Sequence, residues 1–212
     1  MRSKITPKGR ALPVNKPADT RCKRPIHTAQ GTALLVVDVQ NDYFPNGRNQ
    51  MSGAEAASKK AQEIIRQFRA ASLTVAHVQH INLSPEGTFF LPGTLGAAIH
   101  DLAKPLSGEP VITKHKVSSF DGTGLLATLQ DRSINTLVIV GMQTNVCVQA
   151  IALEALQYAL QTTVVTDACA AKTPAIHADQ LEKLKPSVRL IESSEVPSLL
   201  ASIKIGCDTL KG

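Results

Sequence analysis

The sequence contains few of the features that mark several common classes of protein. Only 3% of its 212 residues are aromatic and none is Trp, so the core has to be aliphatic and base-stacking platforms for nucleic acid are scarce. No apolar run reaches the roughly 18 residues of a membrane-spanning helix, and the N-terminus has no apolar secretory signal. We therefore expect a cytoplasmic protein that binds neither nucleic acid nor a membrane.

Motifs for bound metals, nucleotides and disulfides are also missing. The four cysteines form no CxxC pair and no zinc-ligand spacing, so free thiols in a reducing compartment are expected. His77 and His80 stand three residues apart in one expected strand, so their side chains point to opposite faces and cannot bind one ion together. The segment Gly122-Thr-Gly124 lacks the third glycine of a dinucleotide motif. The sequence predicts no metal and no cofactor.

The basic charge is concentrated at one end of the chain. Residues 1–28 contain eight Lys or Arg and one acid, which leaves the rest of the chain at −1 although the total is +6. This segment also contains several prolines and no aromatic residue, so a solvated or oligomer-wrapping arm is favoured over a nucleic-acid-binding one. We predict a basic, proline-containing arm over residues 1–30 and one folded domain over residues 31–212.

Apolar strands alternate with amphipathic helices from residue 31 onward. Residues 32–39 (TALLVVDV) form a continuous apolar run typical of a strand buried on both faces. Such alternation predicts βαβ crossovers and an α/β three-layer sandwich with a six-stranded, mainly parallel, Rossmann-like sheet. The expected strands are residues 32–39, 73–81, 111–113, 136–141, 162–167 and 188–192. The expected helices are residues 53–71, 123–132, 146–160, 175–185 and 195–204.

Candidate chemical groups stand at the carboxyl ends of these strands, where parallel sheets bind ligands. Asp38 ends the first apolar run and is either a proton acceptor or a loop cap. Lys114 ends a short strand and, taken alone, is equally consistent with a surface lysine.

Cys147 lies between a strand and an apolar helix. The helix dipole there favours a thiolate, and unpaired backbone amides of the first turn can receive an oxyanion. The alternative is a small buried hydrophobic residue, which is how we interpret Cys169 after the fifth strand.

Three segments taken together resemble one family. They are LLVVDVQNDYF at 34–44, KHKVSSF at 114–120 and GMQTNVCV at 141–148. In this order and separation they are similar to the isochorismatase-like cysteine hydrolase superfamily, which includes nicotinamidases, carbamoylsarcosine amidases and ureidoacrylate amidases. The similarity covers about residues 31–200.

The resemblance implies an isochorismatase-like hydrolase fold and a catalytic triad. It assigns Asp38 as general base, Lys114 as the catalytic lysine and Cys147 as nucleophile, with the amides of Gln143 and Cys147 forming the oxyanion hole. The family's cis peptide bond would join Met142 to Gln143. The cation and the helix dipole lead us to expect a thiol pKa below the usual value of about 8.5.

Departures from the family pattern narrow the range of reactions that we expect. Nicotinamidases have an Asp-x-His metal set where this chain has His80 and Asn82, so a metal-dependent nicotinamidase is not expected. Several isochorismatases have glycine at the position of Cys147, so the retained cysteine favours cleavage of a C–N bond (amide, ureido or imide) through a thioester. The residues predicted to line the pocket are Phe44, His80, Phe90 and Phe120.

The resemblance further implies a small-molecule substrate and a homodimer or homotetramer. Two alternatives stay open from the sequence. One is a vinyl-ether hydrolase of the isochorismatase type, in which Cys147 is a bystander and pyruvate is released without ammonia. The other is a non-catalytic isochorismatase-like scaffold, which the complete set of triad residues disfavours.

Overall fold

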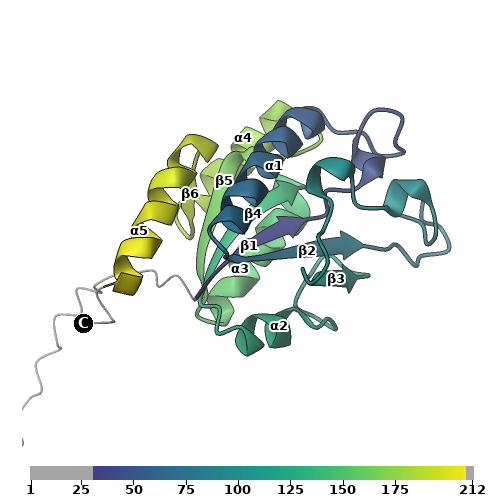
Figure 1. The fold of residues 1–212 in the computed structure, drawn as a ribbon. Coiled ribbons are helices and arrows are strands. Elements are labelled where there is room, and N and C mark those ends of the chain that lie inside the picture. The colour runs from purple at the N-terminus through teal and green to yellow at the C-terminus, as the bar shows by residue number, and fades with distance from the viewer. Residues whose placement is uncertain (1–30, 209–212) are drawn as a thin grey trace, which may run out of the picture.

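The computed structural model describes residues 31–208, with side chains described as far as residue 203. The arm predicted over residues 1–30 lies outside the described residues. The domain is built on a six-stranded sheet in the order β3-β2-β1-β4-β5-β6, in which every neighbouring pair is parallel (Figure 1). The strands are β1 (Thr32–Val37), β2 (Thr74–His80), β3 (Val111–Lys114), β4 (Thr136–Met142), β5 (Gln161–Ala170) and β6 (Arg189–Ile191).

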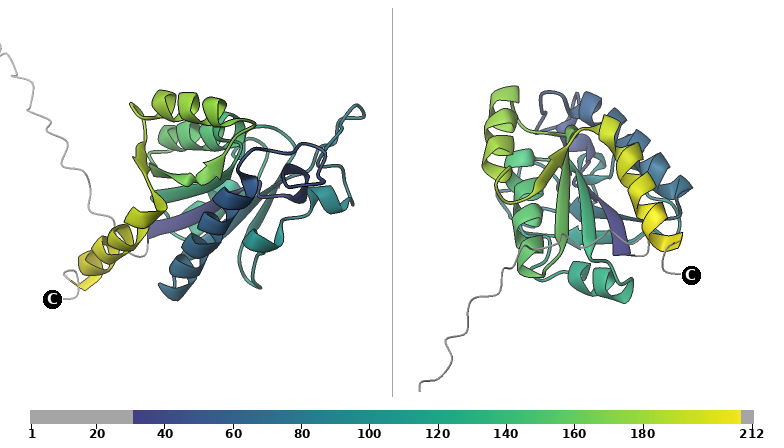
Figure 2. Two further views of the ribbon diagram at one scale, coloured as in Figure 1. Left: turned by 90° about the horizontal axis from the view of Figure 1, so that it is seen from above. Right: turned by 90° about the vertical axis from the view of Figure 1, so that its left-hand side faces the viewer.

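Five α-helices complete the three-layer sandwich that the sequence predicts. Figure 2 shows α1 and α5 on one face of the sheet and α3 and α4 on the other. The helices are α1 (Ala54–Ala70), α2 (Leu125–Asp131), α3 (Gln149–Gln157), α4 (Pro174–Leu184) and α5 (Val196–Asp208). Shorter turns are η2 (Asn41–Tyr43), η3 (Leu95–Ala97), η4 (Asp101–Ala103), the π-helical turn η5 (Thr144–Val148) and η6 (Ser193–Glu195).

The central strand shows how the sequence produces two cores. All six residues of β1 are buried, and alternate side chains point to opposite faces of the sheet. Leu34 and Val36 pack into the core under α1 and α5, whereas Leu35 and Val37 pack into the core under α2, α3 and α4. Burial on both faces explains why this strand is a continuous apolar run.

Three differences from the predicted elements bear on the site. Strand β1 ends at Val37 and not at residue 39, because Asp38 adopts a positive φ of 48° that cannot continue a strand. Strand β5 continues to Ala170, so Cys169 pairs with Gly141 inside the sheet, and the prediction that it follows the strand was wrong. The helix expected over 146–160 is divided into η5 and α3.

The strand order fixes where the site can lie. The chain moves outward from β1 to β2 and β3, and then returns to the other side of β1 with β4. The connection after β1 therefore leads to one side of the sheet, toward β2, and the connection after β4 leads to the other side, toward β5. Such a switch point opens a crevice beyond the carboxyl ends of the two strands.

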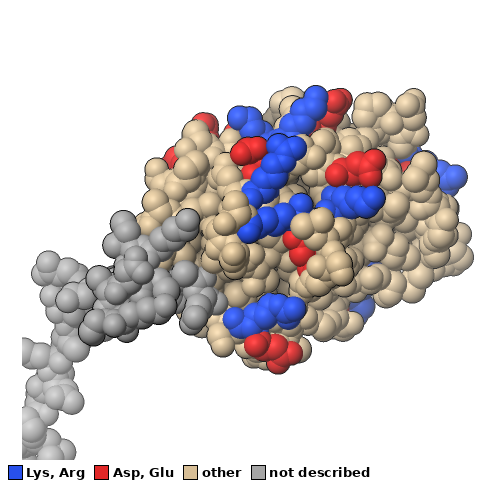
Figure 3. All heavy atoms as spheres, viewed as in Figure 1, with Lys and Arg blue, Asp and Glu red and all other residues tan. Residues whose placement is uncertain are grey.

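The surface is of mixed charge on the face that α1 covers. In Figure 3, basic and acidic side chains are interspersed over this face and form no field of one sign. Several are paired along α1, for example Lys59 with Glu55 and Arg66 with Glu63. Among residues 31–208, no helix has the length and apolar character needed to cross a membrane.

Candidate active site

Asp38, Lys114 and Cys147 meet at the carboxyl edge of the sheet. Asp38 directly follows β1, Lys114 is the last residue of β3, and Cys147 lies in η5 just after β4. The Nζ atom of Lys114 is 3.0 Å from Oδ2 of Asp38, and both side chains are fully buried. The Cys147 sulfur lies within 4.8 Å of a carboxylate oxygen of Asp38 and interacts electrostatically with both Asp38 and Lys114. Three distant segments thus bring an acid, a cation and a thiol into one buried cluster.

Lys114 is held in its charged form. Burial alone would lower the pKa of its ammonium group, but the negative charge of Asp38, together with the interaction with Cys147, outweighs burial and raises that pKa above its usual value. The ammonium group also donates a hydrogen bond of 3.0 Å to the carbonyl of Val117. Lys114 is 1% exposed, so the alternative of a surface lysine was wrong.

The environment of Cys147 favours the neutral thiol. Burial raises its pKa well above the usual value, the Asp38 carboxylate raises it further, and the Lys114 ammonium offsets only part of the increase. The sequence-based expectation of a lowered thiol pKa is therefore wrong for the free site. The cation was foreseen, but the burial of the sulfur and the opposing charge of Asp38 were not weighed against it.

His80, at the end of β2, brings a third metal-ligating atom to the site. One such atom from each of Asp38, His80 and Cys147 lies within 4.8 Å of the other two. These donor types suit Zn²⁺, but a metal ion there would compete with the Lys114 ammonium for the carboxylate of Asp38. Burial lowers the pKa of His80, so its imidazole is neutral near pH 7.

Tyr43 belongs to this cluster, although sequence reasoning did not select it. Its hydroxyl is hydrogen-bonded to the side chain of Gln143, and it interacts electrostatically with Asp38 and Cys147. Burial raises the pKa of Tyr43 well above its usual value, and the charge of Asp38 adds to that increase, so the phenol stays protonated. The available signal was its place five residues after Asp38, within the 34–44 segment.

Two buried polar side chains tie the segment after β1 to its neighbours. The amide nitrogen of Gln40 donates to the carbonyls of His80 and Ala97, and its oxygen accepts from the N–H of His80. Asp42 accepts a 2.6 Å hydrogen bond from the backbone N–H of Phe90. These bonds hold Tyr43 between the end of β2 and the segment around Phe90.

The loop between β4 and Cys147 has a constrained backbone. Gly141 has a φ of 121°, and a Cβ atom there would overlap the carbonyl oxygen of Val37. The Met142–Gln143 peptide bond is cis, which confirms the expectation from the family resemblance. The carbonyl of Gln143 accepts hydrogen bonds of 3.1 Å from the N–H groups of Val146 and Val148, and so closes the turn that carries Cys147.

Comparison with known proteins shows the family of this chain. The family described as the Isochorismatase domain matches residues 32–196. The chain belongs to the isochorismatase family. An uncharacterized isochorismatase family protein of Bacillus subtilis is 42% identical over 142 residues, which are 67% of this chain and 79% of that protein.

A secreted isochorismatase effector of Verticillium dahliae is 32% identical over 179 residues, or 84% of this chain and 90% of that protein. A crystal structure of an isochorismatase family protein from Desulfovibrio vulgaris is 27% identical with a TM-score of 0.75, and the match covers 81% of this chain and 98% of that one. This isochorismatase-family chain is accordingly a hydrolase with the α/β fold of the family.

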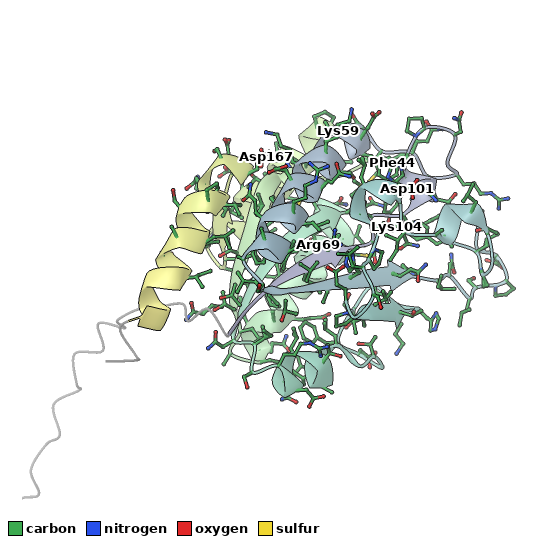
Figure 4. The ribbon with its side chains drawn as sticks, in the orientation of Figure 1. Phe44, Lys59, Arg69, Asp101, Lys104 and Asp167 are labelled. Carbon is green, nitrogen blue, oxygen red and sulfur yellow. The ribbon has the colours of Figure 1, made fainter. Side chains whose placement is uncertain are left out.

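The predicted pocket residues of this hydrolase lie in different places. His80 and Phe90 are neighbours, with ring centres 6.0 Å apart, and Phe90 also packs edge-on against Tyr43 at 4.7 Å. Phe44 instead stacks on His100 at 3.6 Å and borders a separate hollow that also includes Asp101, beside which Figure 4 labels it.

Phe120 packs against Tyr158, with ring centres 4.9 Å apart, in the core under α2 and α3. His80, Phe90 and Tyr43 therefore form the aromatic side of the cluster that contains Asp38, Lys114 and Cys147. Phe44 and Phe120 remain predictions as substrate contacts.

His77 and Asp167 make structural contacts. His77 is 1% exposed and lies 3.0 Å from Glu109, which Arg69 also binds through two nitrogens at 2.7 and 2.8 Å (Arg69 is labelled in Figure 4). Asp167 accepts hydrogen bonds from the backbone N–H and the hydroxyl of Ser193. The first network joins α1 to β2 and the second joins β5 to η6.

Proposed function

We propose that this hydrolase is a cysteine-dependent amidohydrolase that cleaves a C–N bond (amide, ureido or imide) of a small molecule through a thioester on Cys147. The observation that carries the proposal is the burial of one thiol beside a paired carboxylate and ammonium group. Cys147 is only 4% exposed, which favours a substrate of small size.

The neutral thiol determines the first step. Asp38 accepts the proton of Cys147 as the sulfur bonds to the substrate carbonyl carbon, and the carbonyl electrons move to oxygen. The Lys114 ammonium stabilises the negative charge that passes through the sulfur. We assign the resulting oxyanion to the backbone amides of Gln143 and Cys147, each such donor contributing about 3 kcal/mol to the transition state.

The second half of the reaction uses the same acid and base. Asp38 returns its proton to the leaving nitrogen, the C–N bond breaks, and an acyl thioester remains on Cys147. A water molecule then gives its proton to Asp38 and attacks the thioester carbon. The sulfur leaves and recovers the proton, so one amide and one water yield one acid and one amine.

The names of more distant relatives support hydrolysis of a C–N bond. A maleamate amidohydrolase of Pseudomonas putida is 26% identical over 149 residues, and a ureidoacrylate amidohydrolase of Agrobacterium fabrum is 28% identical over 152 residues. Both are named for hydrolysis of an amide or ureido group. We carry this class of substrate, and neither individual compound, to the present chain.

The test is ammonia release from a panel of small primary amides, ureides and imides. Wild type should release ammonia from at least one compound, and Cys147→Ser should lower that rate more than about 100-fold. Cys169→Ser is the matched control, because Cys169 is the other described free cysteine and is also buried. Substantial activity in Cys147→Ser would refute covalent catalysis, and pyruvate release without ammonia from a vinyl ether would favour the isochorismatase reaction.

We also propose that the protein is a homodimer or homotetramer whose ligand is a small molecule, with no role for nucleic acid or membranes. The proposal rests on the family resemblance and on the mixed surface charge of the face in Figure 3. Light scattering of the purified full chain tests it, and a monomer mass at micromolar concentration would contradict it.

A further inference from the structure

A side-chain contact joins the loop before Cys147 to α4, and the mechanism above does not use it. The hydroxyl of Thr144 and Nδ1 of His177 share a hydrogen bond of 2.8 Å across 33 residues of sequence. Which of the two groups donates depends on the tautomer of the ring. Thr144 is fully buried, whereas His177 is half-buried. A buried polar side chain thus has its partner on a different element.

The first turn of helix α4 fixes the position from which the His177 imidazole projects. The helix spans Pro174–Leu184, and the side chain of Thr173 caps it by accepting a hydrogen bond from the N–H of Ile176. Pro174 occupies the first turn, where its fixed φ suits a helix start. The backbone N–H of His177 donates to the carbonyl of Thr173 at 3.1 Å. The ring therefore projects from the capped first turn of the helix.

Thr144 stands directly beside the proposed oxyanion hole. It is the first residue of η5 and follows Gln143, whose carbonyl closes the turn by accepting from Val146 and Val148. Because this turn is short and continuous, a shift of Thr144 would also move the backbone amides of Gln143 and Cys147.

We propose that His177 is a positioning residue that holds Thr144 and, through it, the amides that receive the oxyanion. The inference rests on the proposed cysteine mechanism. Donors displaced by about 1 Å stabilise a transition state much less well than aligned ones, and the loss falls on kcat because the oxyanion exists only during the reaction. Neither Thr144 nor His177 is among the groups that shift the pKa of Cys147, so the reactivity of the thiol itself should not depend on the bond.

A pocket beside His177 makes the contact accessible to an added molecule. The pocket has a volume of about 200 Å³, and its lining includes His177, Ser52, Asp167 and Thr173. Removing the imidazole side chain would add space to this pocket. Free imidazole could then enter and restore the hydrogen bond to Thr144, which a purely structural role of His177 does not predict.

The experiment uses p-nitrophenyl acetate as an acyl donor, so that the natural substrate need not be known. The variants that remove the bond are His177→Ala and Thr144→Val, and the matched controls are Thr144→Ser, which keeps the hydroxyl, and Ile176→Ala on the exposed side of α4. We expect kcat to fall about 10- to 100-fold in both bond-removing variants with little change in KM. Both controls should stay near wild type. After subtraction of the enzyme-free reaction of imidazole with the ester, imidazole should raise kcat of His177→Ala but not of Thr144→Val.

A second measurement distinguishes a positioning role of His177 from general damage to the fold. Alkylation of Cys147 by iodoacetamide is a substitution at a saturated carbon and needs no oxyanion hole. Its rate should therefore be the same in wild type, His177→Ala and Thr144→Val. Equal kcat in all variants, or a parallel loss of kcat and alkylation, would overturn the inference while leaving the proposed function intact. A wild type that releases no nitrophenolate would contradict the proposed function and this inference with it.

Discussion

Removing only the charge of Lys114 should destabilise the protein more than removing both charges of its buried pair. In Lys114→Met the apolar stem is kept, but the carboxylate of Asp38 stays buried without its cation. In the double variant, Asp38→Asn with Lys114→Met, no charge remains in the cluster. Asn is chosen because it tolerates the positive φ of 48° at this position.

The magnitude follows from the geometry of the pair. The charged atoms are 3.0 Å apart and both side chains are fully buried. At an effective dielectric constant of about 20, two charges at that distance attract each other by roughly 5 kcal/mol. Breaking a buried pair on one side costs about 3–5 kcal/mol, whereas a neutral replacement of both partners costs much less. We expect a coupling energy of about 2 kcal/mol or more between the two positions.

The assay is urea unfolding of wild type, the two single variants and the double variant. The account predicts that the double variant is more stable than Lys114→Met, although each of the three variants lacks at least one group that the proposed mechanism uses. Strictly additive losses, or a loss below about 1 kcal/mol for Lys114→Met, would refute the idea that these residues form one tightly coupled ion pair.

Three other predictions follow from the structure. Cys147 should react slowly with iodoacetamide near neutral pH, and Asp38→Asn should shift its pH profile downward because the carboxylate raises the thiol pKa; an unchanged profile would contradict this. Glu109→Gln should cost about 1–3 kcal/mol in urea unfolding near pH 7. Hydrogen bonds and charge from Arg69, together with His77, lower the pKa of Glu109 to about 2 despite its burial. The stability that the Glu109 carboxylate contributes is therefore present above about pH 4.5 and is lost as pH falls toward 2. A cost of Glu109→Gln that does not diminish in acid would contradict this prediction. Gly141→Ala should cost more than about 2 kcal/mol of stability in urea unfolding, and Gly53→Ala, at a φ of 77° and with open space around it, should cost clearly less.

Much of the fold could be predicted because the strands are buried on both faces. Residues 32–37 read as an apolar run for that reason, and the alternation of such runs with helices predicted the parallel sheet. The end of β1 could not be placed, because nothing local marks Asp38 as a residue of positive φ. The length of β5 was also missed, since the pairing of Cys169 with Gly141 is a tertiary contact between strands.

At the site, the meeting of the three side chains was predictable, but the balance of the forces between them was not. Asp38, Lys114 and Cys147 stand at strand ends, and parallel topology brings such ends together. The sign of the thiol pKa shift depends on burial and on two opposing charges, which sequence spacing does not quantify. Tyr43 reaches the cluster only because the buried bonds of its neighbours fold the loop after β1 back over the sheet edge.

The contact between Thr144 and His177 shows the same limit. The two residues are 33 positions apart, and neither stands at an unusual place in its own segment. Only the packing of α4 against η5 brings them together.

The central claim is that Cys147 carries the acyl group during the reaction. The most direct measurement is mass spectrometry of the full chain, acid-quenched within the first turnover of p-nitrophenyl acetate and followed by peptide mapping. The account predicts one acetyl group per chain, located on Cys147 and absent in Cys147→Ser. Turnover with no adduct, or an adduct located on Cys169 instead, would contradict it.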